Sequence, residues 1–185
     1  DIIEMRWDLI DSDVVSRFSS CIRCNILPMI FTIRHHDHGG MWDDSEDARL
    51  SLFLILLRYT PEYIDCEYDA GIVLKGITRE KDSETKLIVS YHNMKSTPQD
   101  LDALLLLMRE AAPGGDIFKV ATYAVSSCDA LRMISFAQKA PGPFIGVCMG
   151  EKGAVTRVSA PMMRCWGTYA ALGKGKATAE GQMTA

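Results

Sequence analysis

Lys119 has the clearest chemical potential in this sequence, because it interrupts an apolar run over residues 117–121. A lysine inside a buried strand loses hydration, which disfavours its charged form and leaves a neutral amine that can attack a carbonyl. Schiff-base chemistry requires such an amine. Taken alone, a lysine in an apolar run is more often a strand-end residue whose charged tip reaches water. Other residues of the sequence are therefore needed to distinguish a buried, nucleophilic lysine from one whose charged tip reaches water.

Several further side chains that could contact a small molecule lie in or directly after other short apolar runs. If these runs are parallel strands, their carboxyl ends meet at one rim, where the active sites of β/α barrels lie. The set consists of Glu4, Arg6, Arg34, Glu67, His92 and Met149.

The elements that would position these residues alternate between strand and helix along the chain. We expect strands over residues 2–6, 29–34, 63–67, 87–91, 117–121, 144–149 and 165–169. Helices are expected over residues 14–21, 46–58, 98–111 and 128–139, with a shorter helix between 71 and 86. The helix over 98–111 has the strongest pattern: Thr97 as N-cap before Pro98, and a buried stripe of Leu101, Leu104, Leu105 and Met108.

Repeated βα units without a glycine-rich phosphate motif leave two α/β architectures, an open doubly wound sheet and a (β/α)8 TIM barrel. The barrel accounts for more of the pattern, because it collects polar residues from many strand ends. Seven strands in 185 residues, against about 250 residues for a typical barrel, imply a single barrel domain over residues 1–185 that lacks its first βα unit and its closing helix. We therefore expect a segment of a longer, multifunctional polypeptide.

The composition favours a cytoplasmic protein that binds a small molecule. The chain has 20 Lys and Arg against 24 Asp and Glu, a net charge of −4, so no basic field indicates nucleic acid or a membrane surface. No apolar stretch is long enough to span a bilayer. The six cysteines lie mostly in apolar runs, which predicts buried thiols, and the Cys21-x-x-Cys24 pair has no second pair at zinc spacing.

Seven short motifs occur in order along the chain, and such an ordered set is much rarer by chance than any one of them. They are Glu4-x-Arg6-x-Asp8, Phe31-Thr32-Ile33-Arg34 before Gly39-Gly40, Tyr63-Ile64-Asp65-Cys66-Glu67, Ser90-Tyr91-His92-Asn93 before Thr97-Pro98, Asp116-Ile117-Phe118-Lys119-Val120-Ala121, Met149-Gly150 with Gly153 and Arg157, and Gly181-Gln182. On these motifs the chain resembles the type I 3-dehydroquinate dehydratase family of the shikimate pathway over essentially its whole length.

The resemblance implies a lyase that works without a cofactor. Lys119 would form an imine with the C3 ketone of 3-dehydroquinate, and His92 would remove the C2 proton and protonate the departing C1 hydroxyl. The products would be 3-dehydroshikimate and water. Without the resemblance, His92 after a strand would more often be an ordinary surface or capping histidine.

The resemblance also assigns the substrate contacts, because a buried polar ligand must find partners for its polar groups. The carboxylate would be clamped by Arg157, helped by Gln182 and by Thr178, which stands in the place of a family serine. The ring hydroxyls would be held by Glu4, Arg6 and Arg34, and the ring would pack against Met149 and Tyr169. For each arginine alone, a surface ion pair is the commoner case.

One position departs from the family in a way that matters for catalysis. His38 stands four residues after Arg34, where the family usually has a glutamate that orients the catalytic histidine. Losing that negative charge should lower the basicity of His92 and reduce activity, unless Asp37 substitutes for it. Asn93 in place of a common aspartate is a milder change, because an amide still forms hydrogen bonds.

The run from His35 to His38 also raises the hypothesis of a metal site. Adjacent ligands in a loop rarely converge on one ion without a distant partner, so a solvated polar loop is the default and we expect no metal. A metal bound there would more readily inhibit than assist imine chemistry.

Two other readings stay open. One is a weakened or inactive dehydratase-like domain that serves as a ligand-binding or structural module within a multifunctional shikimate-pathway polypeptide. The other is a different Schiff-base barrel such as an aldolase, which would not require Arg157 together with Gln182. For the dehydratase itself, we expect a homodimer or fusion to another shikimate-pathway domain.

Overall fold

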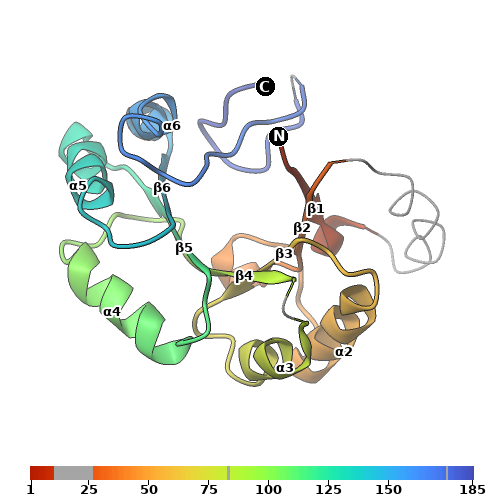
Figure 1. The fold of residues 1–185 in the computed structure, drawn as a ribbon. Coiled ribbons are helices and arrows are strands. Elements are labelled where there is room, and N and C mark those ends of the chain that lie inside the picture. The colour runs from red at the N-terminus through yellow and green to blue at the C-terminus, as the bar shows by residue number, and fades with distance from the viewer. Residues whose placement is uncertain (11–26, 83, 174) are drawn as a thin grey trace. The chain divides into compact units, whose positions relative to one another are not determined.

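The computed structural model describes residues 1–10, 27–82, 84–173 and 175–185. Strands and helices alternate along it (Figure 1), and the strands follow one another in the sheet in chain order, β1 to β6. The chain divides into two compact units, residues 1–89 with 111–116 and residues 90–110 with 117–185. Strand β4 (Lys86–Asn93) begins in the first unit and ends in the second.

The first unit is built on three parallel strands whose carboxyl ends lie at the same edge. Ile3 pairs with Met29 and Arg6 with Thr32, which in turn pairs with Asp65. The elements are β1 (Ile3–Arg6), η1 (Trp7–Leu9), β2 (Met29–Thr32), η2 (His36–His38), α2 (Glu46–Leu57), β3 (Tyr63–Glu67) and α3 (Ile72–Glu80). The core side chains of this unit are fully buried and include Phe31, Ile33, Phe53, Leu56, Ile64 and Ile77.

The second unit is built on β5 (Ile117–Tyr123) and β6 (Phe144–Met149), which pair in parallel from Phe118–Phe144 to Tyr123–Met149. Every residue of β6 is buried, as in parallel strands that are covered on both faces. The other elements are α4 (Leu101–Ala111), α5 (Ser127–Ala137), η3 (Glu151–Gly153) and α6 (Ala154–Val158).

Six of the seven predicted strands are confirmed, and the strand predicted over residues 165–169 is wrong. Within that segment, Trp166 N–H donates to Phe144 O (2.8 Å), whereas Cys165 N–H turns back to Ala160 O (3.1 Å). Successive residues therefore bond in different directions and no ladder forms. The predicted helix over residues 14–21 lies outside the described residues.

The predicted cysteine burial is confirmed in part. Cys66 and Cys148 are buried, Cys165 is half-buried and Cys128 is exposed in the first turn of α5. Cys21 and Cys24 lie outside the described residues. No helix of the described part of the chain is long and apolar enough to cross a membrane.

Helix α4 begins later than predicted, although its buried stripe of Leu101, Leu104, Leu105 and Met108 is confirmed. The cap is Asp100, whose Oδ1 accepts from the Ala103 amide at 2.8 Å. The Thr97 hydroxyl lies instead among buried groups, 2.8 Å from Thr122 Oγ1 and 3.0 Å from Tyr123 O. Thr97 therefore anchors the loop before the helix, and Asp100 caps the first turn in its place.

Replacing Asp100 with alanine should lower the free energy of unfolding by about 1 kcal/mol, because the Ala103 amide loses its acceptor. Asp100→Asn is the matched control, since asparagine caps equally well, and should stay close to wild type. Urea denaturation measures both. Equal losses in the two variants would show that the charge of Asp100, rather than its cap, stabilises α4.

Candidate active site

Arg34, just past the end of β2, is the centre of a buried charge network in the first unit. Its side chain is 3% exposed, and its terminal nitrogens lie 2.7 Å from Asp65 Oδ1 and 2.8 Å from Glu67 Oε1, both on β3. Burial alone would lower the pKa of Arg34, but the charges of Asp65 and Glu67 outweigh it and raise that pKa. The guanidinium is thus permanently charged and held in one orientation.

Arg49 of α2 completes the network from the other side of Glu67. Its Nη1 lies 2.6 Å from Glu67 Oε2 and 3.3 Å from Ile33 O, and its Nη2 lies 2.7 Å from Glu46 Oε2. Burial would raise the pKa of Glu67, yet the charges of Arg34 and Arg49 lower it. Glu67 therefore stays ionised and joins β2, β3 and α2.

The Glu4-x-Arg6-x-Asp8 motif joins this network through Asp8. Asp8 holds Arg6 in a two-bond fork (2.8 and 2.6 Å) and also accepts from the backbone amides of Arg34 and Met41 (3.1 Å each). Glu4 accepts from the Thr32 hydroxyl at 2.9 Å. The structure therefore brings Glu4, Arg6 and Arg34 to one edge of the first unit, as predicted from the strand ends.

His38 is paired with a residue that the sequence did not indicate. Its Nε2 lies 3.1 Å from Asp69 Oδ1, and its side chain is 11% exposed. Burial would raise the pKa of Asp69, but the hydrogen bond and charge of His38 lower it. Asp37, the substitute acceptor considered from the sequence, is 71% exposed and pairs with His35 and His36 instead.

The glycines after His38 explain the tight turn that carries it. Gly39 has a left-handed φ of 76°, a conformation that costs a side-chain-bearing residue energy. A Cβ at Gly40 would collide with the backbone of Arg34. The Gly39-Gly40 pair thus returns the chain against Arg34 and holds the position of His38 relative to it.

In the second unit, Lys119 is buried rather than reaching water. It is 5% exposed in the middle of β5, and its Nζ lies 4.1 Å from the centroid of the Tyr169 ring. The ring face attracts the cationic form of the amine and any cation that replaces it. The snorkelling alternative for Lys119 is therefore wrong.

Arg157, on α6, shares Tyr169 with Lys119. Its Nη1 donates to Tyr169 O at 3.2 Å, and the residue is 3% exposed. Its Nε is buried and has no hydrogen-bond partner among the described residues. Because burial lowers the pKa of Arg157 with little opposing charge, an anion beside it would be stabilising.

The segment that carries Thr178 and Gln182 is fixed at the carboxyl end of β6, next to Met149. Gln182 Oε1 accepts from the Thr178 amide at 2.8 Å and lies 3.3 Å from its hydroxyl, so the predicted pair is brought together. Gly150 N–H donates to Glu180 O at 3.2 Å. Gly181 has a φ of 75°, and a Cβ there would lie 2.7 Å from Gly150 O, so only glycine fits.

His92 lies near the end of β4, the strand next to β5 in the sheet, and is half-buried. Asn93 fixes the backbone that follows: its Oδ1 accepts from the amides of Lys95 and Ser96 at 3.0 Å each, and its amide group donates to Tyr91 Oη at 3.1 Å. The oxygen of Asn93 therefore closes the turn as an aspartate oxygen would.

Comparison with known proteins places these features in one family. The family model described as type I 3-dehydroquinase matches residues 1–185. The 3-dehydroquinate dehydratase of Methanococcus maripaludis strain C6 is 35% identical over 185 residues, which cover 99% of this chain and 83% of that protein. The chloroplastic bifunctional 3-dehydroquinate dehydratase/shikimate dehydrogenase of Arabidopsis thaliana is 34% identical, and the match covers the whole chain but only 31% of that protein.

Solved structures agree with the fold. The type I 3-dehydroquinate dehydratase of Clostridium difficile superposes with a TM-score of 0.86 at 25% identity, covering all of this chain and 77% of that one. The dehydroquinate dehydratase and shikimate dehydrogenase structure from S. pombe gives a TM-score of 0.83 at 27% identity, covering all of this chain and 38% of that one. The predicted α/β barrel class is thereby confirmed.

Replacing Arg34 with methionine should lower the free energy of unfolding by about 3–5 kcal/mol, because Asp65 and Glu67 lose a buried counter-charge. The control Arg79→Met breaks only the exposed Arg79–Glu80 pair and should cost less than about 0.5 kcal/mol. Denaturant unfolding measures both losses. Adding Asp65→Asn to Arg34→Met should recover part of the loss, and no recovery would contradict the charge argument.

The Asp69 carboxyl should titrate below its ordinary value of 3.8, and His38→Gln should raise its pKa toward that value. Because the folded-state pKa is lowered, the pair stabilises the protein above the unfolded-state pKa, and this stability is lost as pH falls through the folded-state pKa. NMR titration of the Asp69 carboxyl carbon measures the shift. His36→Gln is the control, since His36 faces Asp37, and an equal effect of both variants would rule out a specific pair.

Proposed function

This chain belongs to the type I 3-dehydroquinase family, and on that basis we propose that it dehydrates 3-dehydroquinate to 3-dehydroshikimate through a Schiff base on Lys119. The burial of Lys119 on β5, with its Nζ over the Tyr169 ring, carries the proposal. An amine that is held on a strand and shielded from water can attack a bound carbonyl in a fixed geometry.

The first half of the reaction forms the imine. The neutral Nζ of Lys119 attacks the C3 carbonyl, and the resulting carbinolamine takes up one proton and loses water to leave a protonated imine. The final hydrolysis of the imine releases that proton again. This cation draws electrons from the neighbouring C2–H bond. The Tyr169 ring, 4.1 Å from Nζ, would stabilise the same positive charge after it has moved into the imine.

The second half is elimination and release, with His92 as acid and base. His92 takes the proton from C2, and the electrons of the C2–H bond form an enamine. The enamine expels the C1 hydroxyl, which leaves as water with the proton carried by His92. Hydrolysis of the remaining imine releases 3-dehydroshikimate and returns Lys119 to its free amine. Protons balance within the cycle, and no cofactor is required.

Arg157 is the best-supported partner for the substrate carboxylate. Its buried Nε has no hydrogen-bond partner among the described residues, and its buried charge has little compensation. A substrate carboxylate would supply a hydrogen-bond acceptor for Nε and a negative charge for the guanidinium. Thr178 and Gln182 would assist from the segment beyond β6, with Met149 beneath the ring, while Glu4, Arg6 and Arg34 would hold the hydroxyls.

His38 would act as a positioning residue in the place of the family glutamate. The Asp69 carboxylate 3.1 Å from its Nε2 retains a negative charge beside the ring, which supports residual rather than abolished activity. This departure also keeps the second candidate open, a weakened dehydratase-like binding module. Fusion to a shikimate dehydrogenase, as the names of the Arabidopsis and S. pombe relatives indicate for those proteins, would suit this chain. A homodimer and a cytoplasmic location stay predictions.

Borohydride reduction in the presence of 3-dehydroquinate should attach substrate-derived mass to Lys119 in the full polypeptide. Lys119→Met should abolish the adduct and lower turnover by at least about 10³-fold, because the covalent step is lost. Lys139→Met removes an exposed lysine and is the matched control. This variant should still form the adduct on Lys119 and turn over substrate as the wild type does. Peptide mass mapping locates the adduct, and formation of 3-dehydroshikimate measures turnover.

The outcomes of this experiment separate the candidates. An adduct on Lys119 without product would favour the weakened module, and retro-aldol products would replace the dehydratase with an aldolase. A folded protein that forms no adduct on Lys119 would refute the Schiff-base proposal.

A further inference from the structure

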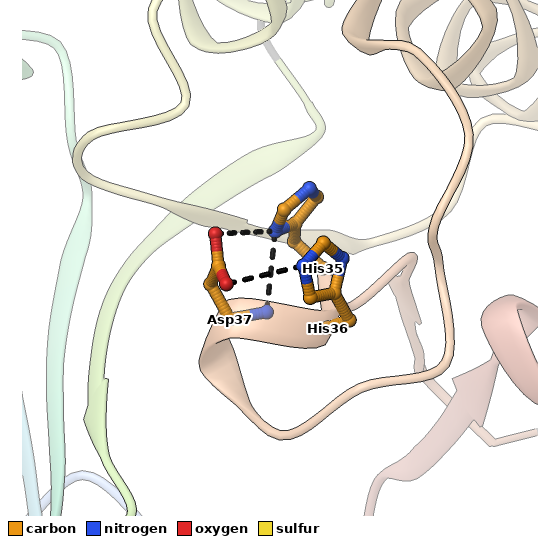
Figure 2. A group of neighbouring side chains, drawn as sticks. All are labelled: His35, His36 and Asp37. Carbon is orange, nitrogen blue, oxygen red and sulfur yellow. Dashed lines mark hydrogen bonds and ion pairs between the residues drawn. The ribbon is translucent and has the colours of Figure 1, made fainter.

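Three potential metal ligands converge at the start of η2, in the segment between Arg34 and His38, and none of the three has a role in the proposed dehydratase chemistry. Figure 2 shows His35, His36 and Asp37 grouped around one point, and one ligand atom from each lies within 4.8 Å of the others. His38 is not part of the group, because its Nε2 is engaged by Asp69. The side chains of His36 and Asp37 are 55% and 71% exposed, so an ion from solution can reach them.

The distances within this group suit a transition-metal ion. His36 Nε2 lies 3.1 Å from Asp37 Oδ1, and His35 Nδ1 lies 3.5 Å from Asp37 Oδ2. Two atoms bound at ordinary zinc distances in a tetrahedral site lie about 3.3 Å apart. Small side-chain movements would therefore bring all three ligands onto one ion.

The second nitrogen of each ring faces an oxygen, which is the usual arrangement around metal-binding histidines. His36 Nδ1 lies 3.3 Å from Trp42 O. A carbonyl oxygen only accepts hydrogen bonds, so a proton on Nδ1 can be donated to Trp42 O, and Nε2 would bind the ion after releasing any proton that it shares with Asp37.

His35 has the complementary arrangement. Its Nδ1 accepts a hydrogen bond from the Asp37 amide at 3.3 Å, which places the lone pair on that nitrogen. Its Nε2 lies 3.9 Å from Glu46 Oε1, a buried oxygen without a hydrogen-bond partner among the described residues. A small movement of Glu46 would let it accept a hydrogen bond from Nε2–H when Nδ1 binds a metal.

We propose that His35 Nδ1, His36 Nε2 and the Asp37 carboxylate bind a divalent transition-metal ion such as Zn²⁺, with water in the remaining position. The η2 turn removes the objection that adjacent loop ligands do not converge, because it folds the three side chains together and Trp42 and Glu46 orient the rings. The ion would replace the contact between the Asp37 amide and His35 Nδ1.

Calorimetric titration of the full polypeptide with Zn²⁺, free of any histidine tag, tests the site. Every protein carries Cys24→Ser, so that the Cys21-x-x-Cys24 thiols do not compete for the metal. One Zn²⁺ per chain is expected, and His36→Ala should weaken binding at least about tenfold by removing a ligand. Glu46→Gln should weaken it about tenfold by replacing the carboxylate behind His35 with a neutral, weaker acceptor. Asp43→Asn removes a nearby exposed charge and is the matched control, which should bind as the parent does.

Visible absorption of bound Co²⁺ gives a second readout, since its intensity distinguishes a four-coordinate site from hydrated Co²⁺. An intense spectrum that His36→Ala abolishes would support the site. Equal Zn²⁺ affinity in His36→Ala and Asp43→Asn, or a Co²⁺ spectrum identical to that of the free ion, would overturn it and leave His35, His36 and Asp37 as a set of ion pairs. Neither readout uses turnover, so failure of the dehydratase proposal would not affect this test.

Discussion

Compensation of buried charge is the constraint on which the first unit depends. Desolvating each ion costs several kcal/mol unless a counter-charge and hydrogen bonds replace water. Arg34 and Arg49 meet that requirement by sharing Glu67, and Asp65 balances the remaining charge of Arg34. The strands β2 and β3 and the helix α2 therefore cannot shift independently, because any displacement would separate ions that water cannot reach. The same rigidity holds a cationic side chain ready at the strand ends.

In the second unit, two buried cationic side chains, Lys119 and Arg157, both contact Tyr169. Tyr169 compensates both in part, with its ring facing the lysine and its carbonyl accepting from the arginine. The buried Nε of Arg157 has no hydrogen-bond partner among the described residues, so an anion beside it would be stabilising. The two units thus hold buried cations in different ways: carboxylates pair with Arg34 and Arg49 in the first, and Tyr169 contacts Lys119 and Arg157 in the second.

The sequence predicted the parts of the structure that depend on local pattern. The strands around Arg34, Glu67 and Lys119 and the buried stripe of α4 follow from apolar periodicity, and the family motifs placed the candidate ligands. The Asp69–His38 pair and the role of Tyr169 could not be read in this way, because each depends on how separate segments meet. Asp100 as the cap of α4 was missed for a related reason: the tertiary contacts of Thr97 occupy the hydroxyl that local pattern assigned to the helix.

The double engagement of Tyr169 has a consequence for how this position would evolve. Its contact with Arg157 is made by a backbone carbonyl, which every amino acid supplies, whereas its contact with Lys119 is made by the ring. Natural variation at this position can therefore tune the environment of the lysine while the arginine contact is inherited unchanged. A survey of tolerated substitutions at position 169 would therefore report only on the contact between the ring and Lys119. The contact between the carbonyl and Arg157 would be affected only by changes that alter the backbone path.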